Sequence, residues 1–177
     1  MTDATCIHEA THASVALHLG LTVREVRVKG WTKVPRYCAQ LYPGVVRGMP
    51  IRTPITLLEE DCLDVSPFEV LVAMAAPSYL PTDDRRINKY AALEAMLAYR
   101  WADKHGIASI RVQARAQRMT AAVEPEIYEM ASRLEQEGVL TAEMLAERHF
   151  DQFQQARADH RRRNDEARPH GGEDRAS

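Results

Sequence analysis

Residues 4 to 19 are rich in alanine and apolar on nearly every face of a helix. A helix with this pattern is stable only when its neighbours bury it almost all round. Gly20 follows directly, and glycine is typical of the position just beyond a helix end. The pattern therefore predicts a buried helix at the start of the chain.

After Gly20, the pattern of apolar residues changes from the period of a helix to the two-residue period of a strand. The stretch VREVRV at 23–28 alternates apolar and charged residues, which is typical of a half-buried strand. Val45, Val46 and the run TPITLL at 53–58 indicate further short strands between glycine and proline breaks. We expect a small β-sheet or hairpin in this part of the chain.

Helical signals return at Ser66. The sequence SPFE offers an N-cap serine, a proline at the first helical position and a glutamate at the third, and the apolar run FEVLVAMAA follows until Pro77. The same kinds of signal predict helices from Thr82 to Gly106, over 109–120, from Pro125 to Glu137, and from Thr141 towards Gln155. The expected fold is α+β and predominantly helical.

Composition divides the chain into one domain and a tail. Residues 157–177 are highly charged and nearly free of apolar residues, which predicts a disordered tail after a domain at 1–156. A net charge of −2 indicates neither a nucleic-acid nor a membrane partner. We see no membrane-spanning run and no signal peptide, so a cytoplasmic location is the expectation. The three cysteines share no CxxC spacing and are interpreted as reduced thiols.

The first helix contains HEATH at residues 8–12, a match to the HExxH motif. His8 and His12 are one helical turn apart, so both imidazoles can bind one Zn²⁺ from the same face. Glu9 lies beside them and can act as the general base that takes a proton from the attacking water. The alternative is a helix face with two hydrogen-bonded histidines, but burying three such polar groups without a metal is costly.

A catalytic zinc usually has a third protein ligand. His18 has the spacing of the metzincin pattern, but Val15 stands where that pattern needs a glycine. On a straight helix, His18 would also point away from the other two histidines. Carboxylates of a later helix are the other candidates.

The stretch HEATHASVALHLGLTVREVRV resembles the FtsH-type peptidases of family M41, in which the zinc helix reads approximately HEAGHAxVxxxLG. The resemblance continues, more weakly, through FEVLVAMAAPSYL, PTDDRRINKYAA and EIYEMASRLEQEGVLTAEML, and covers about residues 4 to 148. It implies a zincin-like peptidase core. It also implies that Asp84 is the third zinc ligand, with Asp83 as the other possibility. Either aspartate could instead complement the dipole of its helix.

Unlike in this family, we expect neither an AAA+ ATPase module nor a membrane anchor in the chain. We therefore expect a zinc-dependent metallopeptidase that cleaves unfolded or flexible polypeptides, or ones delivered by a partner or by an ATPase acting in trans. Such a substrate could add to an exposed strand edge. One alternative is a zinc-binding M41-like module without catalysis. A second is a helical interaction protein with a chance HExxH. The sequence does not predict an oligomeric state.

Overall fold

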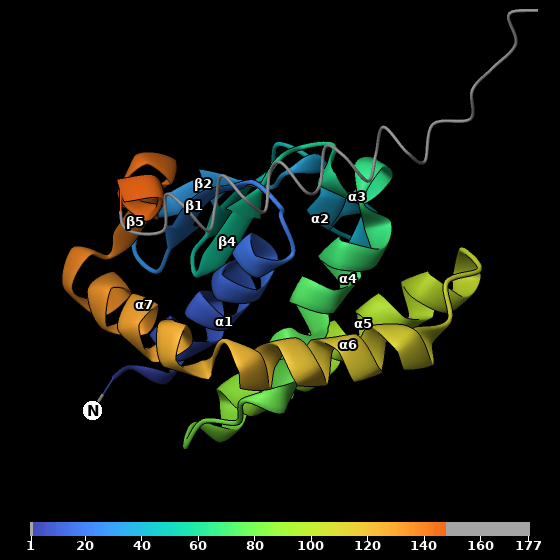
Figure 1. Cartoon of the computed structure of the whole chain (residues 1–177). Helices are drawn as coiled ribbons and strands as arrows, with labels where there is room; N and C mark the ends of the chain where they lie inside the picture. Colours follow the sequence, from blue (N-terminus) through green and yellow to red (C-terminus); the bar gives the residue numbers. More distant parts are fainter. Residues whose placement is uncertain (1, 148–177) are drawn as a thin grey trace, which may run out of the picture.

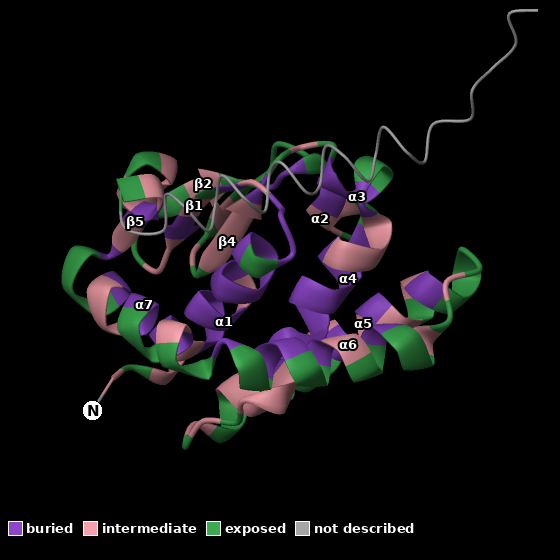
Figure 2. Ribbon diagram, in the orientation of Figure 1, coloured by how far each residue is buried: buried purple, intermediate pink, exposed green. Residues whose placement is uncertain are grey.

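The computed structural model describes residues 2–147, and helix α1 (Ala4–His18) lies at the centre of the molecule (Figure 1). Asp3 caps the start of α1, where its side chain accepts a hydrogen bond from the Thr5 N–H. Gly20 follows the last turn with a φ of 82°, a backbone conformation that glycine adopts without strain. The predicted helix is confirmed, and Figure 2 shows most of it buried, with His18 exposed at its end.

A small antiparallel sheet packs against α1. Strand β1 (Val23–Arg27) lies in its middle, between β4 (Ile55–Leu58) and β5 (Val139–Thr141). Val26 is fully buried and pairs with Thr56 on one side and with Leu140 on the other. Two further strands, β2 (Trp31–Lys33) and β3 (Pro50–Arg52), form a separate antiparallel pair.

The four longer helices that remain within residues 2–147 pack around α1 (Figure 1). Helix α4 (Pro67–Ala75) runs into a 3-10 turn η1 (Ala76–Tyr79), and both contact α1. Helices α5 (Arg85–Lys104) and α6 (Ser109–Ala122) form a helical hairpin, and α7 (Glu124–Glu137) packs along α1. Two short helices, α2 (Arg36–Leu41) and α3 (Cys62–Val65), flank β3 and β4 in the chain. The expectation of a mostly helical α+β fold with a small sheet is confirmed.

Some details differ from the sequence-based predictions. Val45 and Val46 form no strand, because Gly44 and Gly48 both take a positive φ and turn the chain there. Helix α5 begins after its N-cap Asp84, and Thr82 is not the N-cap. The Thr82 hydroxyl and backbone N–H both donate hydrogen bonds to the Asn88 side-chain oxygen. Strand β5 follows Gly138, where the sequence indicates only a helix end. Thr141 accepts a hydrogen bond from the Met144 N–H at the start of helical residues 142–147.

The predicted tail at 157–177 lies outside the described residues. Within 2–147, no helix combines the length and the apolar character that a membrane crossing requires.

Candidate metal centre

The buried central helix carries all three polar residues of the HEATH motif. The exposed fractions of His8, Glu9 and His12 are only 7%, 5% and 12%. His8 and His12 lie one turn apart, and their imidazole rings meet edge to face with centroids 4.8 Å apart. Their Nε2 atoms approach to 3.2 Å. The helix therefore aims both nitrogens at one point inside the protein, as the spacing predicts.

Glu94 of helix α5 completes the cluster. Its Oε2 atom lies 3.0 Å from His8 Nε2 and 3.3 Å from His12 Nε2. Within residues 2–147, His8, His12 and Glu94 form the group whose donor atoms are close enough together to hold a metal ion. The structure thus supplies a third candidate ligand that the sequence analysis did not identify.

The helical phase of α5 explains how a glutamate reaches this buried point. Ala91, Ala95 and Ala98 form the buried stripe of α5, and Glu94 lies on the same stripe, three residues after Ala91 and four before Ala98. The small alanines let α5 pack closely on α4. A charged residue between buried alanines is the sequence signal that could have identified Glu94.

The structure does not bring Asp84 to the two histidines. Asp84 is the N-cap of α5, and its Oδ1 atom accepts a hydrogen bond of 2.7 Å from the Arg86 N–H. It precedes Glu94 by ten residues, which is about 15 Å along a helix. Asp83, its exposed neighbour, belongs to the same helix start, and His18 is exposed at the far end of α1. The structure thus places Glu94 beside the two histidines, whereas the aspartates that the resemblance to M41 implies lie at the start of α5.

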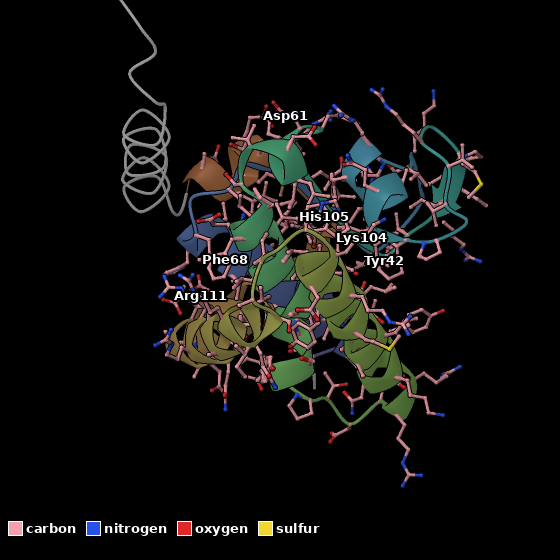
Figure 3. The ribbon with its side chains drawn as sticks, turned by 90° about the vertical axis from the view of Figure 1, so that its right-hand side faces the viewer. Tyr42, Asp61, Phe68, Lys104, His105 and Arg111 are labelled. Atoms are coloured by element: carbon pink, nitrogen blue, oxygen red, sulfur yellow. The ribbon has the colours of Figure 1, made fainter. Side chains whose placement is uncertain are left out.

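Further contacts fix the orientation of His12 and Glu94. His12 Nδ1 lies 2.9 Å from the Ala73 carbonyl oxygen. This nitrogen therefore carries the ring proton and donates a hydrogen bond to the carbonyl. In the neutral ring, the Nε2 lone pair then points at the cluster. The Tyr42 hydroxyl donates to the other oxygen of Glu94, Oε1, at 2.8 Å, and Figure 3 shows Tyr42 beside α5. The buried Nδ1 of His8 has no protein partner within residues 2–147.

The electrostatics of the cluster favour a bound cation. Burial alone would lower the pKa of His12, but the adjacent Glu94 carboxylate raises it to about 9. Burial would likewise raise the pKa of Glu94, yet His12 and His8 hold it well below its usual range. Glu94 is therefore ionised at neutral pH, and the point between the three side chains attracts a proton or a metal ion.

The distances fit a zinc ion. With zinc bonds of about 2.0–2.2 Å and tetrahedral angles, neighbouring ligand atoms lie about 3.3 Å apart. The three pairs of donor atoms here are separated by 3.0, 3.2 and 3.3 Å. Imidazole nitrogens suit Zn²⁺ better than Mg²⁺ or Ca²⁺, and two histidines with one glutamate are a known ligand set of catalytic zinc.

Glu9 faces the same cavity as the cluster. Its Oε2 atom lies 2.9 Å from the Thr56 hydroxyl of strand β4, and burial raises the pKa of its carboxyl group. A cavity of about 90 Å³ is lined by Glu9, His12 and Glu94 together with apolar side chains of α2, α4 and β4. A water molecule or a small reacting group in this cavity would contact both Glu9 and the cluster.

The cysteines contribute no ligand to the cluster. All three are free, and only Cys38 lines the cavity. Burial raises the pKa of Cys6 to about 11 and those of Cys38 and Cys62 to about 12. At neutral pH they are therefore thiols in the metal-free protein, and geometry leaves their sulfur atoms out of the cluster.

Tyr37 of helix α2 covers part of strand β4. Its hydroxyl donates to the Thr56 carbonyl oxygen at 2.9 Å and accepts from the Leu58 N–H at 3.1 Å. These backbone groups are the ones that an added strand would use. The expected addition of a substrate to a free strand edge therefore requires Tyr37 to move away from this part of β4.

We expect Tyr37→Phe to lower the free energy of unfolding by about 1–3 kcal/mol, because the buried backbone groups of Thr56 and Leu58 both lose their partner. Urea denaturation followed by circular dichroism measures this. Tyr90→Phe is the matched control, since Tyr90 is 63% exposed on α5, and it should change stability by less than about 0.5 kcal/mol. A Tyr37→Phe protein as stable as the control would show that these bonds contribute nothing.

Comparison of the chain with models of known protein families, with curated proteins and with solved structures gives no match. The functional argument therefore depends on the site itself.

Proposed function

We propose that this protein is a zinc-dependent metallopeptidase with His8, His12 and Glu94 as its metal ligands and Glu9 as its general base. The observation that carries the proposal is the convergence of three donor atoms within 3.3 Å of one another, beside a buried glutamate on the same helix. Neither feature alone would suffice, because buried ion pairs also occur for purely structural reasons.

Each residue of the motif has a role in the proposed reaction. When bound, zinc would supply Lewis acidity, which polarises a substrate carbonyl and makes a water molecule more acidic. Glu9 would take the proton of the attacking water and pass it to the leaving amine of the cleaved peptide bond. The Thr56 hydroxyl, which can donate to Glu9 Oε2, would orient that carboxylate. Tyr42 and the Ala73 carbonyl would hold Glu94 and His12 in place.

The surroundings of the cluster support an unfolded or flexible polypeptide as the substrate. The cavity is small, and α2 lies over one side of it, so a folded protein surface could not reach Glu9. A single extended chain could enter between α2 and β4 once Tyr37 moves. A delivery partner or an ATPase in trans would help to present such a chain.

We further propose that the core is zincin-like and related to family M41, on the strength of the HEATHASVALHLG helix. The third ligand would then differ from the family pattern, since Glu94 lies in the middle of its helix and the family uses an aspartate near the start of one.

Hydrolysis of an unfolded reporter protein tests the proposed function. Purified protein loaded with zinc should release fragments, a chelator should stop the release, and added zinc should restore it. Fragment release that persists after complete zinc removal would contradict a zinc peptidase.

The alternative is a zinc-binding module without catalysis, and the burial of the site favours it. Glu9 is 5% exposed, Tyr37 of α2 lines the cavity, and the hydroxyl of Tyr42, which follows α2, donates to Glu94. Such a module would bind zinc with the same ligands yet release no fragments from any unfolded reporter.

A further inference from the structure

The pair of strands β2 and β3 forms an exposed surface near the cavity. Trp31 and Arg52 are direct cross-strand partners, as are Lys33 and Pro50, and all four side chains are exposed. Trp31 is 67% exposed, although a side chain of this size contributes most when it is buried. Trp31 therefore offers a large aromatic side chain to a partner from the open face of this strand pair.

Positive charge is concentrated in the same part of the chain. Between residues 24 and 52 there is a single acidic side chain, Glu25, and there are seven basic ones: Arg24, Arg27, Lys29, Lys33, Arg36, Arg47 and Arg52. Three of these arginines have acidic partners, Arg27 with Glu25, Arg36 with Asp64 and Arg47 with Glu60. Within residues 2–147, Lys33 and Arg52 have no ion-pair partner. Their charge is thus available to a ligand, in a chain whose net charge is −2.

The chain connects this surface directly to the candidate site. Strand β2 leads through Val34 and Pro35 into α2, which carries Tyr37 and ends next to Tyr42. Strand β3 leads through Thr53 and Pro54 into β4, and Pro54 itself lines the cavity. Figure 3 shows the blue and teal strands at one margin of the molecule, away from the helical hairpin. A chain bound to β2 and β3 would lie beside the two segments that flank the cavity.

We propose that the exposed face of β2 and β3 is a docking surface for acidic segments of unfolded polypeptides, the substrate class of the candidate site. This inference rests on the proposed peptidase function. Carboxylates of the bound segment would pair with Lys33 and Arg52, and an apolar side chain between them would pack on Trp31. A single-stranded nucleic acid fits less well, because the face offers one aromatic ring and no series of stacking platforms.

Direct binding tests the docking surface without hydrolysis. The full chain with Glu9→Gln, loaded with zinc, is titrated into a short labelled peptide of glutamate, leucine, serine and glycine, and fluorescence anisotropy is followed. A second peptide has lysine in place of glutamate. We expect the acidic peptide to bind at least about tenfold more tightly than the basic one, and less tightly as added salt screens the charges.

Variants assign the binding to this face. The double variant Lys33→Glu and Arg52→Glu, and separately Trp31→Ala, should each weaken binding of the acidic peptide by about tenfold or more. All three side chains are exposed, so the variants should keep the wild-type melting temperature. The matched controls are Arg86→Glu on α5 and Ile110→Ala on α6, both highly exposed, and neither should change the affinity.

Three results would overturn the proposal: equal binding of the two peptides, unchanged affinity in the Trp31 and charge variants, or tighter binding of a single-stranded oligonucleotide or of phosphatidylserine vesicles through these same residues. Failure of the proposed function is a separate result. In that case the acidic peptide still binds, and the protein with Glu9 intact releases no fragments.

Discussion

Replacing Glu9 by glutamine should lower the rate of peptide hydrolysis by about 100- to 10,000-fold while leaving one zinc ion per chain. Glutamine has nearly the same shape and can still accept a hydrogen bond from the Thr56 hydroxyl, so the packing around α1 should persist. It cannot take a proton from water, and a positioned general base typically contributes a factor of this size. The measurement is fragment release from an unfolded reporter, together with zinc content.

The matched control is Glu59→Gln, because Glu59 is an exposed glutamate that takes no part in the cluster. It should keep the wild-type rate. If the Glu9→Gln protein cleaved the reporter as fast as this control, Glu9 would not be the base, and the zinc-binding module without catalysis would gain support.

Zinc should stabilise the wild-type protein, and His12→Ala should abolish that effect. A ligand present at about a hundred times its dissociation constant adds about 2.7 kcal/mol to the free energy of unfolding when it binds only the folded state. His12 supplies one of three donor atoms and is itself held by the Ala73 carbonyl. For each protein, we define the zinc increment as its melting temperature with zinc minus its melting temperature with chelator. Because this difference is taken within one protein, it is independent of any packing that the substitution removes.

His18→Ala is the matched control for His12→Ala, since His18 lies on the same helix but is exposed. Its zinc increment should equal that of the wild type. A wild-type melting temperature that zinc leaves unchanged would contradict a metal site, as would a full increment in the His12→Ala protein.

Local patterns in the sequence were sufficient to predict the main helices and two of the three cluster residues, His8 and His12. The buried alanine-rich helix, the HExxH spacing and the glycine that ends the helix are all local, and each is found where the pattern indicates. Strand β5 was missed, because three residues that pair with β1 from far along the chain leave almost no pattern of their own.

The third candidate ligand could not be predicted in the same way. Which residue of α5 meets α1 depends on how the two helices pack. His12 and Glu94 are 82 positions apart in the chain, so no local pattern connects them. Asp84 and its neighbour are conspicuous as a pair of acids, but a helix start is a favourable place for acids in any protein. Glu94 is less conspicuous, although the alanines around it mark the buried face of its helix.

Zinc content of the purified protein, measured by elemental mass spectrometry, tests the central claim most directly. It should be determined for the wild type, for Glu94→Gln and for Asp84→Asn, after equal exposure to zinc and removal of the excess. We predict one zinc per chain in the wild type and in Asp84→Asn, and a large loss in Glu94→Gln. A wild-type protein without stoichiometric zinc would contradict the account, as would a Glu94→Gln protein that retains the metal while Asp84→Asn loses it.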